Sequence, residues 1–193
     1  MFIPTSLHIG IWNAWILMSI FIVQMIIVFC AGAHLRERSH IPHAARYTAL
    51  EKYTGVLGNM VWLFALGYSV FLPLYLGTLW FICGLIIYIP GLLLLSLATY
   101  NFMHTPLDQM IQSGAYKYSR HPMYLATFLI CLGTGVAAAS WLFILLSVIM
   151  AFCFRKEALI EERYCLDKYK EQYRDYMNTV PRWFGTVKPN AHK

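Results

Sequence analysis

Acidic side chains are scarce in this sequence, and charge of either sign is confined to a few segments. The 193 residues include nine Asp and Glu and fifteen Lys and Arg. Charged residues make up 12% of the chain, about half the share of an ordinary soluble domain. Residues 1–35, 53–107 and 121–154 contain none. Soluble helices normally carry a polar face. These runs therefore exclude an ordinary soluble fold and predict membrane spans, which need about 20 apolar residues each.

Several motifs that would indicate other chemistry are also missing. The five cysteines form no CxxC pair, and four lie in apolar runs, so we expect neither a disulfide framework nor a zinc site. The histidines lack HxxxH spacing, so no metal is expected. The absence of a Gly-x-Gly-x-x-Gly motif argues against a soluble Rossmann domain. A net charge of +6 without a basic stripe does not favour nucleic-acid binding.

The distribution of Lys and Arg predicts the topology. If the run 121–154 crosses the membrane twice, all fifteen basic residues lie on one side, as the positive-inside tendency favours. We therefore expect a single all-α integral membrane domain over 1–193, with the N-terminus outside and the C-terminus cytoplasmic. The last two spans form a short helical hairpin with arms of only ~21–24 Å, at a rise of ~1.5 Å per residue. The five predicted transmembrane helices are 9–33, 55–72, 78–98, 123–138 and 140–154.

The tail after the last span combines an apolar stripe with misplaced charges. No Gly or Pro occurs between Arg155 and Val180, so we expect the fifth helix to continue as a cytosolic helical extension. At 100° per residue, one stripe holds Arg155, Leu159, Glu162, Leu166, Tyr169, Tyr173, Tyr176 and Val180. We expect this stripe, with Arg155 and Glu162, to be buried against the cytosolic ends of the membrane helices, and Glu161 lies beside it. A buried carboxylate without a partner costs several kcal/mol. Glu162 therefore needs either an internal ion pair, for example with Arg120, or a ligand.

The segment before the fourth span carries a second polar cluster. Pro122 suits the first turn of a helix, and amides at that helix start favour an anion. Arg120 offers a planar donor set for a carboxylate or phosphate, and His121 and Tyr124 stand beside it. The alternatives are a membrane-interface anchor for Arg120 and a plain surface turn for Gly114-Ala115-Tyr116.

Taken together, these residues resemble the isoprenylcysteine carboxyl methyltransferases, integral membrane enzymes broadly related to the phospholipid N-methyltransferases. The similar stretch runs over residues 110–183 and includes Ser113–Tyr116, Ser119–Tyr124, Arg155, Glu161-Glu162, and Tyr169 through Val180-Pro181-Arg182. The compact length suggests a small prokaryotic or archaeal member. Two positions depart from the family pattern: Ala115 replaces a frequent Pro, and Lys170 replaces a frequent Gly.

The resemblance implies S-adenosylmethionine as methyl donor, S-adenosylhomocysteine as product, and no metal. It implies a lipophilic acceptor that enters from the bilayer, with an isoprenylcysteine carboxylate as one candidate. The cofactor pocket is expected in the cytosolic segments 100–122 and 155–193. The catalytic candidates are Arg155, which would steer the acceptor, and Glu162. The candidate cofactor contacts are Gly114, Tyr116, Arg120, His121, Pro122, Tyr124, Glu161 and Glu162.

Two other classes of protein remain open at this stage. NADPH-dependent membrane sterol-type reductases carry a similar Arg-His-Pro-x-Tyr segment, and a non-catalytic lipid-binding membrane protein would use the stripe charges as internal ion pairs. On every alternative we expect a multi-pass membrane protein. The expected location is the cell membrane in a prokaryote or the endoplasmic reticulum in a eukaryote, with the cofactor site on the cytoplasmic side.

Overall fold

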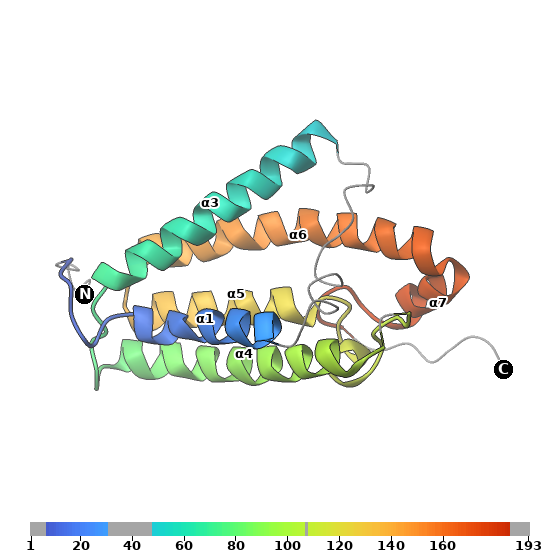
Figure 1. Ribbon diagram of the computed structural model, residues 1–193. Helices are drawn as coiled ribbons and strands as arrows, with labels where there is room; N and C mark the ends of the chain where they lie inside the picture. The colour runs from blue at the N-terminus through green and yellow to red at the C-terminus, as the bar shows by residue number, and fades with distance from the viewer. Residues whose placement is uncertain (1–6, 31–47, 107, 186–193) are drawn as a thin grey trace.

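A computed structural model of the chain describes residues 7–30, 48–106 and 108–185. Within these ranges the structure is all-helical and has no strand beyond one isolated bridge between Asn13 and Pro73, as predicted. The helices are α1 (Trp15–Cys30), α3 (Ala49–Phe71), α4 (Leu79–His104), the short 3-10 helix η1 (Gly114–Lys117), α5 (Pro122–Ala137), α6 (Trp141–Tyr169) and α7 (Glu171–Thr179). Figure 1 shows α1, α4 and α5 running alongside one another, with α3 crossing α6 obliquely.

Small residues let α4 and α5 approach closely along their length, as is common between membrane helices. A Cβ added to Gly84 of α4 would overlap the backbone of Ala137, and one added to Gly133 of α5 would overlap the backbone of Tyr88. Tyr88 also donates a hydrogen bond of 2.8 Å to the carbonyl of Leu17, which joins α4 to α1. The pair α4 and α5 therefore forms the most extensive helix contact of the described structure.

The hairpin predicted from charge is present in the structure. α5 ends at Ala137, and α6 begins at Trp141 after the N-cap Ser140, whose hydroxyl accepts from the Phe143 amide at 3.3 Å. Pro122 occupies the first turn of α5, as expected. The short loop keeps α5 and α6 adjacent and antiparallel.

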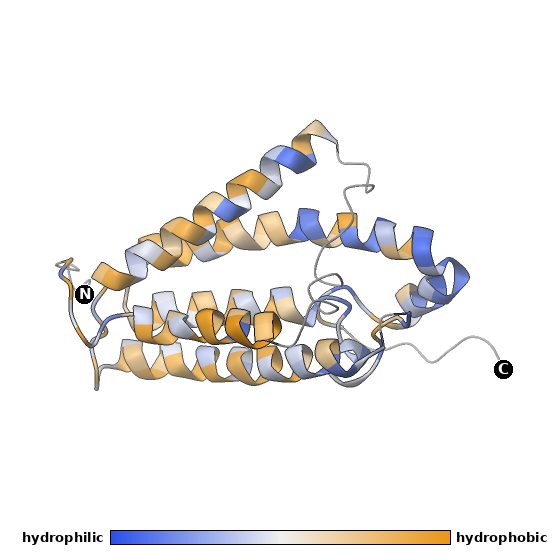
Figure 2. Ribbon diagram, in the orientation of Figure 1, coloured by the Kyte–Doolittle hydropathy of each residue, from blue (hydrophilic) through white to orange (hydrophobic). Residues whose placement is uncertain are grey.

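Several helices carry apolar side chains on their outer surfaces. By length and composition α3 and α4 are able to cross a membrane, whereas α1 and α5 are apolar but have 16 residues each. Large exposed apolar side chains include Ile22, Met25, Phe29, Leu63, Phe64, Ile86 and Leu93. Figure 2 shows α6 changing from hydrophobic at its start to hydrophilic at its end, where α7 and the loop before α5 also lie. The polar segments therefore gather at one end of an otherwise apolar bundle.

The first helix begins later than predicted. The expected span started at residue 9, but α1 starts at Trp15 because the preceding residues pair with the connection between α3 and α4. The amide of Ala14 donates to the carbonyl of Leu72 at 2.8 Å, and the amide of Leu74 donates to the carbonyl of Trp12 at 2.9 Å. The buried Asn13 amide group adds two further bonds to backbone carbonyls. Residues 31–33 of the predicted span lie outside the described residues.

The prediction of one uninterrupted helix to Val180 is wrong. α6 ends at Tyr169, Lys170 adopts φ 48° and ψ −123°, and the chain turns into α7. The turn brings Tyr173 and Tyr176 of α7 against Met110 in a small apolar cluster. A straight helix would have carried these tyrosines away from that contact.

The burial predicted for Arg155 is also wrong, because this side chain is exposed while Glu162 on the same stripe is 3% exposed. The segment around Arg182 and the loop before α5 cover α6 at Glu162 but leave it uncovered at Arg155. A helical wheel describes one direction around the helix but not how its surroundings change along the axis.

Replacing Lys170 by Gly should stabilise the protein. Non-glycine residues held at such a positive φ cost about 1–3 kcal/mol, so we expect Lys170→Gly to raise the free energy of unfolding by about 1 kcal/mol. Unfolding in mixed micelles titrated with denaturing detergent measures the change. Asp167→Gly, inside α6, is the matched control and should lose about 0.3 kcal/mol. Equal losses in both variants would contradict the strain at Lys170.

Candidate active site

Glu162 is the centre of a buried ion-pair network at the polar end of the bundle. Arg182 donates to it through two atoms, with Nε 2.9 Å from Oε1 and Nη2 2.6 Å from Oε2. Nη2 of Arg120 lies 3.2 Å from Oε1. The Glu162 side chain is 4% exposed and that of Arg120 is 9% exposed. The internal ion pair considered from the sequence is therefore present, and Arg182 is a second partner.

His121 lies between two carboxylates. Its Nδ1 is 3.1 Å from Oε2 of Glu161, and its Nε2 is 3.2 Å from Oε1 of Glu162. An ionised carboxylate only accepts hydrogen bonds, so an imidazolium, which donates from both ring nitrogens, satisfies both contacts at once. Burial opposes this charge, but the hydrogen bonds to Glu161 and Glu162 outweigh it and raise the pKa of His121 above its usual value.

Glu161 differs from Glu162 in its access to solvent. Its side chain is 34% exposed, whereas that of Glu162 is 4% exposed. The Tyr124 hydroxyl donates a short hydrogen bond to Oε1 of Glu161, while His121 holds Oε2. Tyr124 in turn stacks on Phe154 with ring centroids 5.0 Å apart. Glu161 is thus oriented by two donors and still accessible to a ligand.

Electrostatics separates the members of this network. Burial alone would raise the pKa of the Glu162 carboxyl, but hydrogen bonds from His121 and Arg182, with the charges of Arg120 and Arg182, lower it to about 2. The hydrogen bond to Glu162 likewise raises the pKa of the Arg182 guanidinium. Glu162 is therefore ionised throughout the physiological pH range and is a poor proton acceptor.

Backbone contacts hold the two halves of the site together. The Arg120 amide donates to the carbonyl of Pro181 at 3.0 Å, and the Ser119 hydroxyl donates to the carbonyl of Arg182 at 3.1 Å. The same hydroxyl accepts from the His121 amide at 3.2 Å. The loop before α5 and the segment after α7 are consequently joined as one unit around Glu162.

Gly114 and Tyr116 support this loop from behind. Gly114 has φ 58°, a value that favours glycine, and a Cβ there would overlap the Asn101 side chain. Asn101 Oδ1 accepts from the Ala115 amide at 3.0 Å. The Tyr176 hydroxyl donates to the carbonyl of Tyr116 at 2.6 Å, which fixes the loop on α7.

The structure therefore brings together five of the residues singled out from the sequence: Arg120, His121, Tyr124, Glu161 and Glu162. Pro122 is buried at the start of α5, and Arg155 lies on α6 two turns before Glu162 with its side chain exposed. Within the described ranges no group of His, Cys, Asp or Glu is arranged to hold a metal.

Sequence analysis missed Ser119, Arg182 and Trp183 as members of the site. Ser119 and Arg182 make the contacts given above, and the Trp183 ring lies 5.8 Å from that of His121. Arg182 and Trp183 fall inside the stretch that carries the family resemblance, and this was the available signal. Nothing in the local sequence showed that α7 would return them to Glu162.

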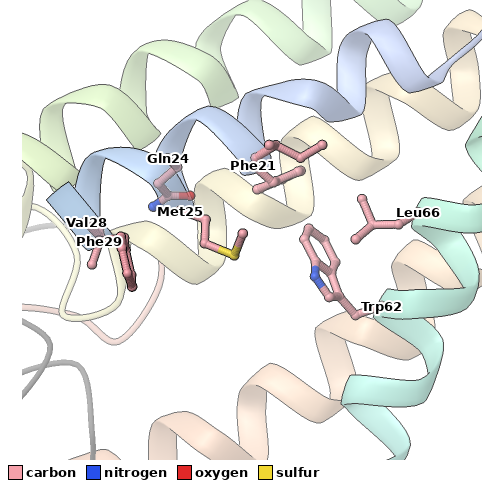
Figure 3. Close-up of a pocket in the computed structure, with 8 residues that line it drawn as sticks. Phe21, Gln24, Met25, Val28, Phe29, Trp62 and Leu66 are labelled. Carbon is pink, nitrogen blue, oxygen red and sulfur yellow. The ribbon is translucent and has the colours of Figure 1, made fainter.

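An apolar groove lies between α1 and α3. It has a volume of about 460 Å³ and is lined by Phe21, Ile22, Gln24, Met25, Val28, Phe29, Trp62 and Leu66. Figure 3 shows the α1 side chains facing Trp62 and Leu66 of α3 across this space. Trp62 meets Phe21 edge to face at 4.5 Å, and both pack, with Phe154, against the same core cluster. This cluster connects the groove to the ring that stacks on Tyr124.

Removing the charge of Glu162 should destabilise the protein strongly. Glu162→Gln leaves two guanidinium groups without their counter-charge, and breaking a buried pair costs about 3–5 kcal/mol. Glu171→Gln is the control, because its pair with Arg174 is exposed and such pairs contribute about 0–1 kcal/mol. The free energy of unfolding measures both variants. A loss at Glu162 no greater than that at Glu171 would contradict a central role for this network.

The similarity of this chain to known proteins includes the loop before α5 and Glu161-Glu162 on α6. The model of the phospholipid methyltransferase family matches residues 72–172, more than half of the chain. Protein-S-isoprenylcysteine O-methyltransferase from Saccharomyces cerevisiae is 28% identical over 72 residues, which make up 37% of this chain and 30% of the yeast protein. Both findings confirm the predicted resemblance. This chain therefore belongs to the phospholipid methyltransferase family and is similar to its isoprenylcysteine carboxyl methyltransferases.

Proposed function

We propose that this membrane methyltransferase transfers a methyl group from S-adenosylmethionine to a lipophilic acceptor at the cytoplasmic face of the membrane. The observation that carries the proposal is the buried network of Arg120, His121 and Glu162, which lies at the polar end of an apolar bundle. A site of this kind suits a charged cofactor and a lipid substrate at once. The protein would be a multi-pass protein of the cell membrane in a prokaryote, or of the endoplasmic reticulum in a eukaryote.

The residues present fit the amino-acid end of this cofactor. Nε of Arg120 is buried and has no hydrogen-bond partner among the described residues, so it is a donor that suits a carboxylate. Arg182 is partly exposed beside it. Glu161 is accessible and suits the ammonium group or a ribose hydroxyl. On this proposal Arg120 and Arg182 bind one charge of the ligand, and Glu161 binds the other.

Glu162 acts in the proposal through its partners. Its oxygens are already engaged by Arg120, Arg182 and His121, and its side chain is almost fully enclosed. It would therefore orient the guanidinium groups before a ligand arrives, which reduces the ordering cost of binding. Gly114, Tyr116 and Pro122 would shape the loop that carries Arg120.

The bound cofactor would supply an electrophilic methyl group to the acceptor. The yeast relative's name contains isoprenylcysteine, so the carboxylate of an isoprenylcysteine is one acceptor that we propose. A carboxylate is already nucleophilic, so the protein's contribution would be positioning and exclusion of water. An amine acceptor would also need to lose a proton, which a carboxylate side chain can accept. Arg155, exposed on α6, would steer the head group of an anionic acceptor.

The groove between α1 and α3 supports a lipophilic acceptor. Its lining is almost entirely apolar, and Trp62 and Phe154 pack against one core cluster next to Tyr124. We propose that the apolar chain of the acceptor lies in this groove while its head group reaches the polar site.

Binding of S-adenosylhomocysteine tests the cofactor. The wild-type protein should bind it, and both Glu161→Gln and Arg120→Ala should weaken binding at least tenfold, because each removes one charged contact. Glu171→Gln, exposed on α7, is the control and should leave the Kd unchanged. Undiminished binding in both site variants would reject this site. Stabilisation of the protein by NADPH alone would favour a membrane reductase instead.

Transfer of label to membrane lipids tests the acceptor groove. Radiolabelled S-adenosylmethionine and a membrane lipid extract should give a labelled lipid with the wild-type protein. Leu66→Trp fills the groove and should lower this transfer at least fivefold while leaving S-adenosylhomocysteine binding within twofold. Leu57→Trp, nine residues earlier on α3, is the matched control and should transfer at the wild-type rate. Full activity of Leu66→Trp would exclude the groove.

A further inference from the structure

His121 is too enclosed to be read simply as a cofactor contact. Its side chain is 5% exposed, and each ring nitrogen is within hydrogen-bond distance of a different carboxylate. A ligand would have to displace Glu161 or Glu162 before it could bond to the ring. The imidazole therefore acts on a ligand through these two residues.

The groups around His121 come from three parts of the fold. Glu161 and Glu162 face it from α6, and the Tyr124 ring from α5 stacks on it at 5.8 Å. Arg182 and Trp183 stand on the C-terminal side, and Arg120 precedes it in the chain. The two carboxylates are neighbours in the sequence and repel each other, and a positive ring between them offsets that repulsion.

We infer that His121 is a positioning residue that, as an imidazolium, holds the Glu161 carboxylate in the orientation that receives the cofactor. This inference rests on the proposed function. The Tyr124 hydroxyl holds one oxygen of Glu161, and His121 Nδ1 holds the other, so the carboxylate is fixed at both ends. Loss of the ring proton would turn one donor into an acceptor that faces a carboxylate, and one of the two contacts would become repulsive.

The sign of the pH dependence follows from this role. The neighbouring carboxylates raise the pKa of His121 above its value in an unfolded chain. Its contribution is complete at low pH and is lost as the pH rises through the raised pKa. Binding should therefore weaken with rising pH, by up to about tenfold per pH unit above that pKa, since one proton is involved. If the ligand instead displaced His121 from Glu161, rising pH would strengthen binding.

The test measures the Kd of S-adenosylhomocysteine by calorimetry between pH 6 and 8.5 on the full-length protein. We expect the wild-type Kd to rise with pH. His121→Gln should bind at least fivefold more weakly at pH 6 and should lose the pH dependence of the wild type. His104→Gln, which changes an exposed histidine at the end of α4, is the control and should follow the wild type. A wild-type Kd that falls with pH, or a profile shared by His121→Gln, would overturn the inference.

A second measurement needs no ligand. Nitrogen NMR of the imidazole, assigned by the loss of its signals in His121→Gln, should show both ring nitrogens protonated at pH 6. A neutral ring with one unprotonated nitrogen would overturn the inference even if S-adenosylhomocysteine binds. Absence of binding by the wild-type protein at every pH would reject the proposed function and, with it, the assigned role of His121.

Discussion

The contact between Glu162 and Arg182 is the constraint on which the polar end of this protein depends. Arg182 follows α7, whereas Glu162 lies inside α6, so the pair forms only if the chain reverses between them. The reversal occurs at Lys170, at a backbone conformation that favours glycine. The buried ion pairs and the tyrosines packed on Met110 offset this strain. The strained backbone at Lys170 is thus the local cost of a site in which Arg120, Arg182 and His121 converge on Glu162.

Much of the fold was predictable because helices in a membrane protein appear in the sequence as long runs without charged residues. The uncharged runs predicted the helices. The expectation that all Lys and Arg residues lie on one side of the membrane predicted the hairpin that turns near Ser140. The boundaries failed where polar contacts intervened. Asn13 donates to the carbonyl of Val70 near the end of α3 and to that of His8, and it keeps the residues before it out of α1. Such a contact joins residues 57 apart in sequence, and no periodicity reports it.

Sequence analysis predicted part of the buried polar cluster but not its geometry. The wheel correctly turned Glu162 inward, and the segment before α5 supplied Arg120 and His121 as partners. The helical wheel failed at Arg155. The loop before α5 and the segment around Arg182 cover α6 at Glu162 but do not reach Arg155, whose side chain is exposed. The departure noted at Lys170 was informative, since the resemblance implied a glycine there, and Lys170 is one of two non-glycine residues with a positive φ in the described part of the chain. The glycine expected at this position indicated a positive φ before the structure showed it.

The adjacent residues Glu161 and Glu162 differ in exposure and therefore in what each can do in the site. Glu162 is enclosed by three donors and has a pKa lowered to about 2. It therefore stays ionised and holds its cationic partners in position. Glu161, one residue earlier, keeps a third of its side chain exposed and accepts a hydrogen bond from Tyr124, whose ring stacks on Phe154. One end of the site is thus rich in guanidinium groups, and the other presents a carboxylate beside aromatic rings. A ligand with an anionic end and a cationic end would match this polarity in one orientation, with its cationic end toward the apolar core.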